Sequence, residues 1–134
     1  MGTAALDTNV LLRLVVPDLP THHERARRLL ARPGAKYLVS DYAFVELVFA
    51  LDRHYGLTRD QIATVVQTII SLDNISCQTD QLASAVQFWK THPKLSFEDC
   101  LMAEHAETNG ALPLWTFDRK LARHHLAAEE VPEQ

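Results

Sequence analysis

Residues 4–12 read A-A-L-D-T-N-V-L-L, and the expected fold class follows from how this stretch is built. Apolar residues lead up to Asp7 and resume at Val10, with Thr8 and Asn9 between them. A short apolar run of this kind is typical of a buried strand, and an Asp after it is a favoured N-cap for a helix. The stretch therefore predicts a strand that passes directly into a helix, with polar side chains at the junction.

The rest of the chain repeats this alternation of short apolar runs and helical patterns. The sequence predicts strands at 3–7, 36–40, 74–78 and 111–117, and helices at 9–16, 21–32, 41–55, 58–72, 79–92, 96–108 and 118–126. The expected N-caps of four of these helices are Thr21, Asp41, Thr58 and Ser96. Strands that alternate with helices favour a parallel sheet covered on both faces. We therefore expect an α/β protein, an α/β/α sandwich around a small parallel sheet of four or five strands, with a short polar tail from about residue 129.

Length and composition indicate one globular domain over residues 1–134. The two cysteines, Cys77 and Cys100, lack the spacing of a zinc or redox site, which is typical of a reducing compartment. No apolar run reaches the length of a membrane span and no signal peptide is evident, so we expect a cytoplasmic protein. Because the net charge is -4, contact with a nucleic acid would need local basic patches or bound cations.

Glu46 interrupts the apolar run A-F-V-E-L-V-F-A-L at 43–51, where every neighbour within three positions is apolar. A buried, unpaired carboxylate is strongly destabilising, so it must meet a cation, meet a basic side chain or become protonated. The nearest basic residues on this helix, Arg53 and His54, lie roughly 10 Å further along the helix axis. We therefore expect Glu46 to be buried and to require a cation from elsewhere.

Three further acids have ordinary structural explanations when each is taken alone. Asp7 and Asp118 can cap the helices that follow them, and Asp99 can close a capping box opened by Ser96. Together with Glu46, however, they are expected to converge at the carboxyl edge of the sheet, where open parallel sheets bind ligands. Clustered carboxylates repel one another unless a divalent cation lies between them, and the lack of His and Cys in these motifs favours Mg²⁺ or Mn²⁺ over zinc.

Four short motifs extend this pattern along nearly the whole chain. They are L-D-T-N-V-L-L at 6–12, V-S-D-Y-A-F-V-E-L at 39–47, F-E-D-C-L-M-A-E-H-A at 97–106 and L-W-T-F-D-R-K-L at 114–121. Each motif alone is weak. In this order and spacing, however, the chain resembles the PIN-domain ribonucleases and, within them, the VapC-like toxins of type II toxin–antitoxin systems.

The resemblance implies a small α/β/α fold and an endoribonuclease that depends on Mg²⁺ or Mn²⁺ and leaves 5′-phosphate and 3′-hydroxyl ends. It places the catalytic and metal-binding residues at Asp7, Glu46, Asp99 and Asp118. It places supporting polar residues at Asn9 and Thr116, and further at Thr8 or Ser40.

Finer roles follow from the same resemblance. Asp7 and Asp99 are the expected direct ligands. Glu46 is expected either to bind the metal or to hold a ligand in place, and Asp118 to bind a second, weaker metal. Glu98 is an alternative to its neighbour Asp99, although the register of the motif favours Asp99.

The resemblance also implies an RNA substrate and protein partners. We expect an antitoxin whose C-terminal segment occludes the acidic site, and a homodimer built on helices of the first half. The expected RNA contacts next to Asp118 are Arg119, Lys120 and Arg123, with His124 and His125. A second basic run is more typical of a solvated helix face and comprises Arg25, Arg27, Arg28 and Arg32. Aromatic positions expected in the core or at a subunit interface are Tyr42, Phe44, Phe49 and Trp89.

Two other functions remain open at this stage. A phosphoaspartyl phosphatase or receiver domain also places an Asp at the end of its first strand, but Asp7 is followed by T-N rather than by a second acid. A non-catalytic PIN-like domain that binds RNA or protein is the second alternative, and the presence of all four acids counts against it.

Overall fold

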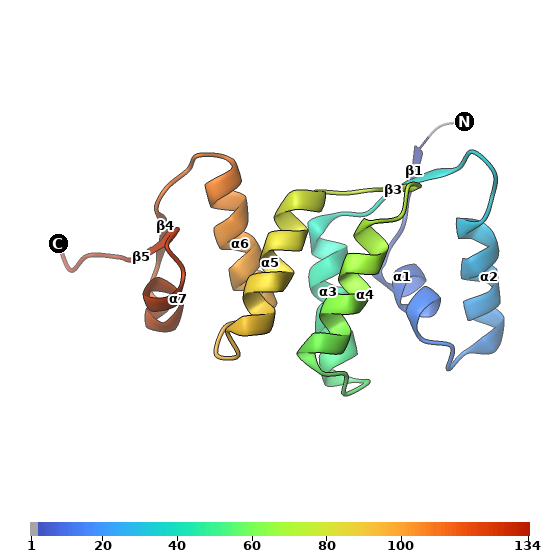
Figure 1. Cartoon of the computed structure of the whole chain (residues 1–134), viewed down its shortest axis with the longest axis horizontal. Helices are drawn as coiled ribbons and strands as arrows, with labels where there is room; N and C mark the ends of the chain where they lie inside the picture. The colour runs from blue at the N-terminus through green and yellow to red at the C-terminus, as the bar shows by residue number, and fades with distance from the viewer. Residues whose placement is uncertain (1–2) are drawn as a thin grey trace. The chain divides into compact units, whose positions relative to one another are not determined.

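The computed structural model describes residues 3–134, and helices alternate with short strands along the chain (Figure 1). The elements are β1 (Thr3–Ala5), α1 (Thr8–Val15), α2 (Pro20–Leu30), β2 (Lys36–Leu38), α3 (Asp41–Arg53), α4 (Arg59–Ile70), β3 (Ile75–Ser76), α5 (Thr79–Thr91), α6 (Phe97–Thr108), β4 (Leu114–Thr116), α7 (Arg119–His124) and β5 (Ala128–Glu130). The α/β class predicted from the sequence is confirmed.

The chain forms two compact units, Met1–Thr79 and Asp80–Gln134. The first contains a three-stranded parallel sheet in the order β1-β2-β3, and the second contains a parallel pair, β4-β5. All of these pairings are parallel, as predicted, but the described strands divide into two sheets rather than one. The prediction of a single domain over residues 1–134 stays a prediction.

The core of the first unit contains buried residues of its central strand and of its helices. Strand β2 is central and buries Tyr37, whose hydroxyl donates to the Leu29 carbonyl oxygen at 2.6 Å. Helix α3 contributes the fully buried Phe44 and Leu51 and packs against α1 and α4 (Figure 1). Strand β1, predicted to be buried, is exposed at all three residues; among the described strands it lies at the edge of the sheet, next to β2.

Two of the four predicted N-caps are confirmed. Thr58 forms a complete capping box with Gln61 at the start of α4, and the Ser96 hydroxyl accepts from the backbone N–H of Asp99 at the start of α6. The box predicted at Thr21 is wrong, because α2 begins at Pro20, whose fixed φ suits the first turn of a helix.

The cap of α3 is also one residue earlier than predicted. The hydroxyl of Ser40, not the carboxylate of Asp41, accepts from the backbone N–H of Ala43 at 3.2 Å. Asp41 instead occupies the first helical position, where an acid is favoured by the helix dipole.

The end of the second unit differs from the sequence prediction. The polar tail expected from about residue 129 is partly a strand, because Ala128–Glu130 pair with Leu114–Thr116 as β5. The buried Ala128 anchors this strand, whereas the acidic residues after it conceal the strand pattern in the sequence. Within residues 3–134, the helices lack the length and apolar composition that crossing a membrane requires.

Candidate functional site

Asp7 lies at the junction of β1 and α1, as the opening stretch predicts. Its Oδ1 accepts a hydrogen bond from the backbone N–H of Val10 at 3.0 Å, so the carboxylate caps α1. Its Oδ2 has no hydrogen-bond partner within residues 3–134. The side chain is exposed, which leaves one carboxylate oxygen available to a ligand.

Glu46 is exposed on α3, and the prediction that it is buried is wrong. It shares a helix face with Tyr42 and Phe49, which are 70% and 53% exposed. The sequence did not indicate this exposed face, because the apolar residues near Glu46 suggest burial. In the described structure, however, the two aromatic residues on its face are exposed to solvent. No basic side chain pairs with Glu46 in residues 3–134; its Oε1 accepts from the hydroxyl of Thr8 at 2.9 Å.

The Thr8–Glu46 hydrogen bond joins α1 to α3 at the residue that follows Asp7. It therefore brings two of the predicted acids into the same local region of the first unit, since Thr8 is adjacent to Asp7 in the chain. Asn9 is exposed on the same first turn of α1. Of the predicted supporting residues, Thr8 is the one that contacts a candidate acid through its carboxylate.

Asp118 caps α7 in the second unit. Its Oδ1 accepts from the backbone N–H groups of Lys120 and Leu121 at 2.9 and 3.2 Å, and its Oδ2 has no hydrogen bond within the described chain. Thr116 supports this turn by accepting from the backbone N–H of Asp118 at 2.9 Å. Thr116 thus binds the backbone of Asp118 rather than its carboxylate, and its supporting role in the site stays a prediction.

Asp99 occupies the first turn of α6 and is half-buried. Its backbone N–H donates to Ser96, but its carboxylate has no hydrogen bond or ion pair among residues 3–134. The neighbouring Glu98 is exposed.

The donor set of these acids suits a hard divalent cation. Each unit supplies two of the four, and within residues 3–134 none of them is neutralised by Lys, Arg or His. Carboxylate oxygens are the ligands that Mg²⁺ and Mn²⁺ prefer in proteins. That all four share one site stays a prediction.

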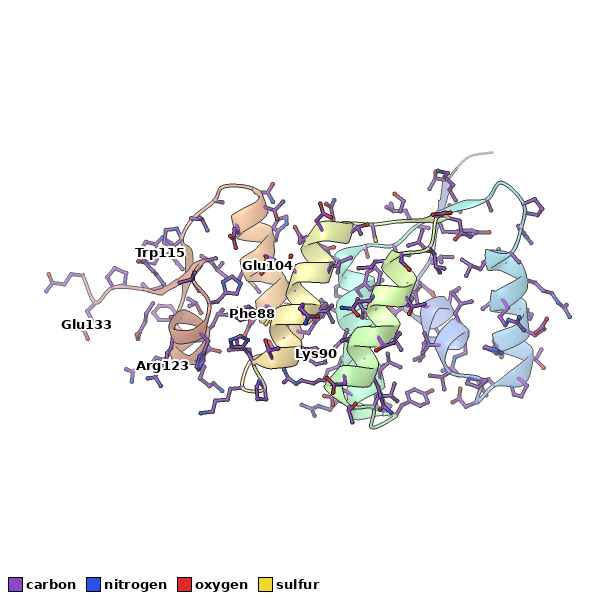
Figure 2. All side chains as sticks on the ribbon, viewed as in Figure 1. Phe88, Lys90, Glu104, Trp115, Arg123 and Glu133 are labelled. Atoms are coloured by element: carbon purple, nitrogen blue, oxygen red, sulfur yellow. The ribbon has the colours of Figure 1, made fainter. Side chains whose placement is uncertain are left out.

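The basic residues predicted to contact RNA divide into exposed and buried members. Lys120 and Arg123 are exposed, and Arg123 extends from α7 (Figure 2). Arg119 is exposed as well, and its Nε lies 3.3 Å from the Glu130 carboxylate on β5. His125, however, is 5% exposed and cannot contact RNA in this conformation. The aromatic residues predicted to lie in the core or at a subunit interface also divide. Phe44 and Trp89 are buried in the core, whereas Tyr42 and Phe49 are exposed.

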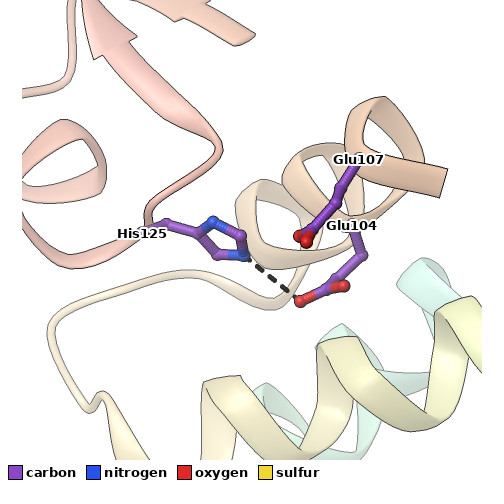
Figure 3. A group of neighbouring side chains, drawn as sticks. All are labelled: Glu104, Glu107 and His125. Carbon is purple, nitrogen blue, oxygen red and sulfur yellow. Dashed lines mark hydrogen bonds and ion pairs between the residues drawn. The ribbon is translucent and has the colours of Figure 1, made fainter. Parts of the chain in front are cut away.

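A group that the sequence analysis missed involves His125, Glu104 and Glu107 in the second unit. One potential ligand atom from each lies within 4.8 Å of the others, close enough to hold a metal ion (Figure 3). The Nε2 atom of His125 lies 3.2 Å from Oε1 of Glu104. Glu104 is half-buried and Glu107 is exposed. The three residues come from α6 and the segment after α7, so no sequence spacing could have revealed them.

The hydrogen bonds of His125 indicate which of its ring nitrogens carries the proton. The backbone N–H of Ala127 donates to Nδ1 at 3.0 Å, so Nδ1 is an acceptor without a proton. In a neutral ring the proton must then be on Nε2, where it is donated to Glu104. A histidine that binds a metal through one ring nitrogen usually donates the N–H of the other nitrogen to an acceptor. In His125 the other nitrogen, Nδ1, instead faces a donor, the backbone N–H of Ala127. The arrangement therefore fits a structural hydrogen bond between α6 and the end of α7.

We expect Glu104→Ala to lower the free energy of unfolding by about 1–3 kcal/mol, because it leaves the buried Nε2–H of His125 without an acceptor. Glu104→Gln should stay close to the parent, since its amide oxygen can still accept. Urea unfolding followed by circular dichroism measures both, with Glu107→Gln as the exposed control. Equal losses for the alanine and glutamine variants would contradict the role assigned to this hydrogen bond.

The cysteines take no part in the candidate site. Burial raises the pKa of the Cys77 thiol, a hydrogen bond with Thr79 lowers it, and the nearby Asp41 charge raises it. The net shift is upward, so Cys77 is a protonated thiol at neutral pH and a poor nucleophile. Cys100 is fully buried in the core of the second unit.

Comparisons with known proteins complete the description of the site. A family model described as "PIN domain" matches residues 4–125. Among solved structures, the crystal structure of Mycobacterium tuberculosis VapC20, a sarcin-ricin loop cleaving toxin, is 18% identical. That match covers 91% of this chain and 94% of the other, with a TM-score of 0.45. A comparison with curated proteins found no match.

Proposed function

Because the chain belongs to the PIN-domain family, we propose that it is a metal-dependent endoribonuclease that hydrolyses RNA phosphodiester bonds. The observation that carries the proposal is that none of its four candidate acids is neutralised by a basic side chain within residues 3–134. The proposed ligands are Asp7, Glu46, Asp99 and Asp118.

The chain's own residues would position these ligands. Asp7 and Asp118 each use Oδ1 to cap a helix, which fixes the carboxylate and leaves Oδ2 for a cation. The hydroxyl of Thr8 orients Glu46 through a hydrogen bond to one oxygen. Such outer contacts hold a ligand in its productive orientation. Asp99 is the acid with no hydrogen bond to its carboxylate in the described chain, so it has both oxygens available.

Mg²⁺ is the proposed cofactor, with Mn²⁺ as the alternative. A bound divalent cation would supply an activated water and neutralise developing charge on the phosphate. The four carboxylates provide oxygen ligands only, which favours these ions over zinc. The exposed side chains of Lys120 and Arg123 next to Asp118 are proposed to attract the RNA backbone.

The finer biological assignment is a toxin of a type II toxin–antitoxin pair that acts in the cytoplasm. It is supported by the order and spacing of the four motifs along the chain. The proposed partners are an antitoxin that occludes the acidic site and a second copy of the chain. The exposed aromatic side chains of Tyr42 and Phe49 on α3 offer apolar area for a protein contact.

A cleavage assay tests the proposal. The purified protein should cut a mixed RNA pool in Mg²⁺ or Mn²⁺, cutting should stop when EDTA removes the cation, and it should return when the cation is restored. An Asp99→Asn variant purified in parallel should remain inactive, which excludes a contaminating nuclease. RNA that stays intact under all conditions, or is cut equally in EDTA, would overturn the proposed function.

A further inference from the structure

Helices α1 and α2 of the first unit border an open groove of about 510 Å³ that is rich in arginine. We name it the arginine groove; its defining residues are Arg25 and Arg28 on α2, Arg32 in the turn after α2, and Asn9, Val10 and Arg13 on α1. We propose that the arginine groove binds the phosphate backbone of single-stranded RNA. This inference rests on the proposed function and extends it by naming where the substrate strand lies.

Helical spacing places Arg25 and Arg28 on one face of α2, because residues three apart lie next to each other on a helix surface. Arg32 follows the end of the helix and lines the same groove from the turn after α2. Arg27 does not line the arginine groove; it lines a separate, mainly apolar cavity against α4. The sequence predicts one solvated face for all four arginines, whereas the structure separates Arg27 from the other three.

The charge of the groove is largely uncompensated. Arg25 and Arg32 are exposed and make no ion pair or hydrogen bond with any of residues 3–134. Arg28 lies 3.5 Å from Glu24, but that carboxylate is shared with Arg27 at 3.4 Å. In a protein of net charge -4, this local concentration of positive charge gives the groove a potential that attracts anions.

Arg13 also lines the groove but does not add to this excess positive charge. Arg13 is 9% exposed, and its guanidinium donates to Asp18 at 2.6 Å and to the hydroxyl of Tyr55 at 3.2 Å. Its charge is therefore matched by one acid. The excess comes from Arg25, Arg28 and Arg32, whose planar guanidinium groups can bind phosphate oxygens through two hydrogen bonds at once.

The position of the groove favours RNA over other polyanions. Asn9 lines it, and Asp7, a candidate metal ligand, lies two residues earlier at the start of the same helix. Asn9 makes no side-chain hydrogen bond within residues 3–134, so its amide is available to a sugar or base. An RNA strand held by Arg25, Arg28 and Arg32 would thus run toward the proposed cleavage site.

Binding measurements in EDTA test the groove without cleavage. Fluorescence anisotropy with a short labelled single-stranded RNA compares the parent, Arg25→Gln/Arg32→Gln, and a matched control, Arg27→Gln/Arg53→Gln. Both variants lose two positive charges, but only the first alters the groove. We expect the groove variant to bind about tenfold more weakly and its slope of log K against log salt to fall by roughly 1.4, or about 0.7 for each lost phosphate contact. The control should stay within about twofold of the parent.

Three results would overturn the inference. They are equal weakening in both variants, no RNA binding by the parent, and binding of a polyglutamate peptide as tight as that of RNA with the same dependence on Arg25 and Arg32. The last would assign the groove to an acidic protein segment. Cleavage by the parent in Mg²⁺ is scored separately. Groove-dependent binding without cleavage overturns the proposed function alone, and cleavage without groove dependence overturns this inference alone.

Discussion

We expect Asp7→Asn to lower the kcat/KM for the proposed RNA cleavage by about 10³-fold or more and to leave the protein folded. A loss of this size corresponds to about 4 kcal/mol of transition-state stabilisation, as expected when a charged metal ligand becomes neutral. The fold persists because asparagine is as good an N-cap as aspartate, so its amide oxygen can still accept from the backbone N–H of Val10. The expected change in the free energy of unfolding is within about 0.5 kcal/mol.

The control for this experiment is Asp73→Asn. Asp73 is exposed in the same unit, before β3, and makes no ion pair or hydrogen bond within residues 3–134. It changes the net charge equally but should leave cleavage unchanged. Initial rates with a labelled RNA and urea unfolding in metal-free buffer give the two readouts. Cleavage by Asp7→Asn within about tenfold of the parent would exclude Asp7 as a metal ligand.

Phe44→Ala is expected to cause the largest loss of stability, about 3–5 kcal/mol. Phe44 is 0% exposed and lies on α3, which packs against α1 and α4. Removing its ring loses buried apolar area and leaves a cavity that the surrounding helices can fill only in part. Because small proteins are stable by only about 5–15 kcal/mol, this one change removes a large share of the total.

Tyr42→Ala is the matched control on the same helix. Tyr42 is 70% exposed, so its truncation should alter the free energy of unfolding by less than about 0.5 kcal/mol. Urea unfolding monitored by circular dichroism compares both variants with the parent. Similar losses for the two variants would mean that the burial pattern of α3 differs from the one described.

The sequence predicts local structure well where the signal is local. The alternation of elements, the capping box at Thr58 and the cap at Ser96 depend on residues within one helical turn, and all are confirmed. The Asp7 and Asp118 caps are confirmed for the same reason. At each of these positions a hydrogen bond within a few residues fixes the outcome.

The predictions that failed depend on residues far apart in the chain. Glu46 was expected to be buried because its neighbours are apolar, but hydrophobicity alone cannot tell which face of α3 meets solvent. His125 was grouped with surface basic residues because its partner Glu104 lies on α6, 21 positions away. Strand β5 was missed because its pairing with β4, rather than its own acidic sequence, makes it a strand.

The two oxygens of each carboxylate, at Asp7 and at Asp118, have different surroundings, and this difference affects which mutants a genetic selection should recover. One oxygen of each caps a helix and the other is available to the proposed metal, and an asparagine amide can replace the carboxylate only as the cap. Under selection against a harmful nuclease, aspartate-to-asparagine changes at these positions should therefore yield escape mutants that accumulate to normal levels and resist proteolysis. A screen for degraded or truncated protein would miss these folded but inactive variants.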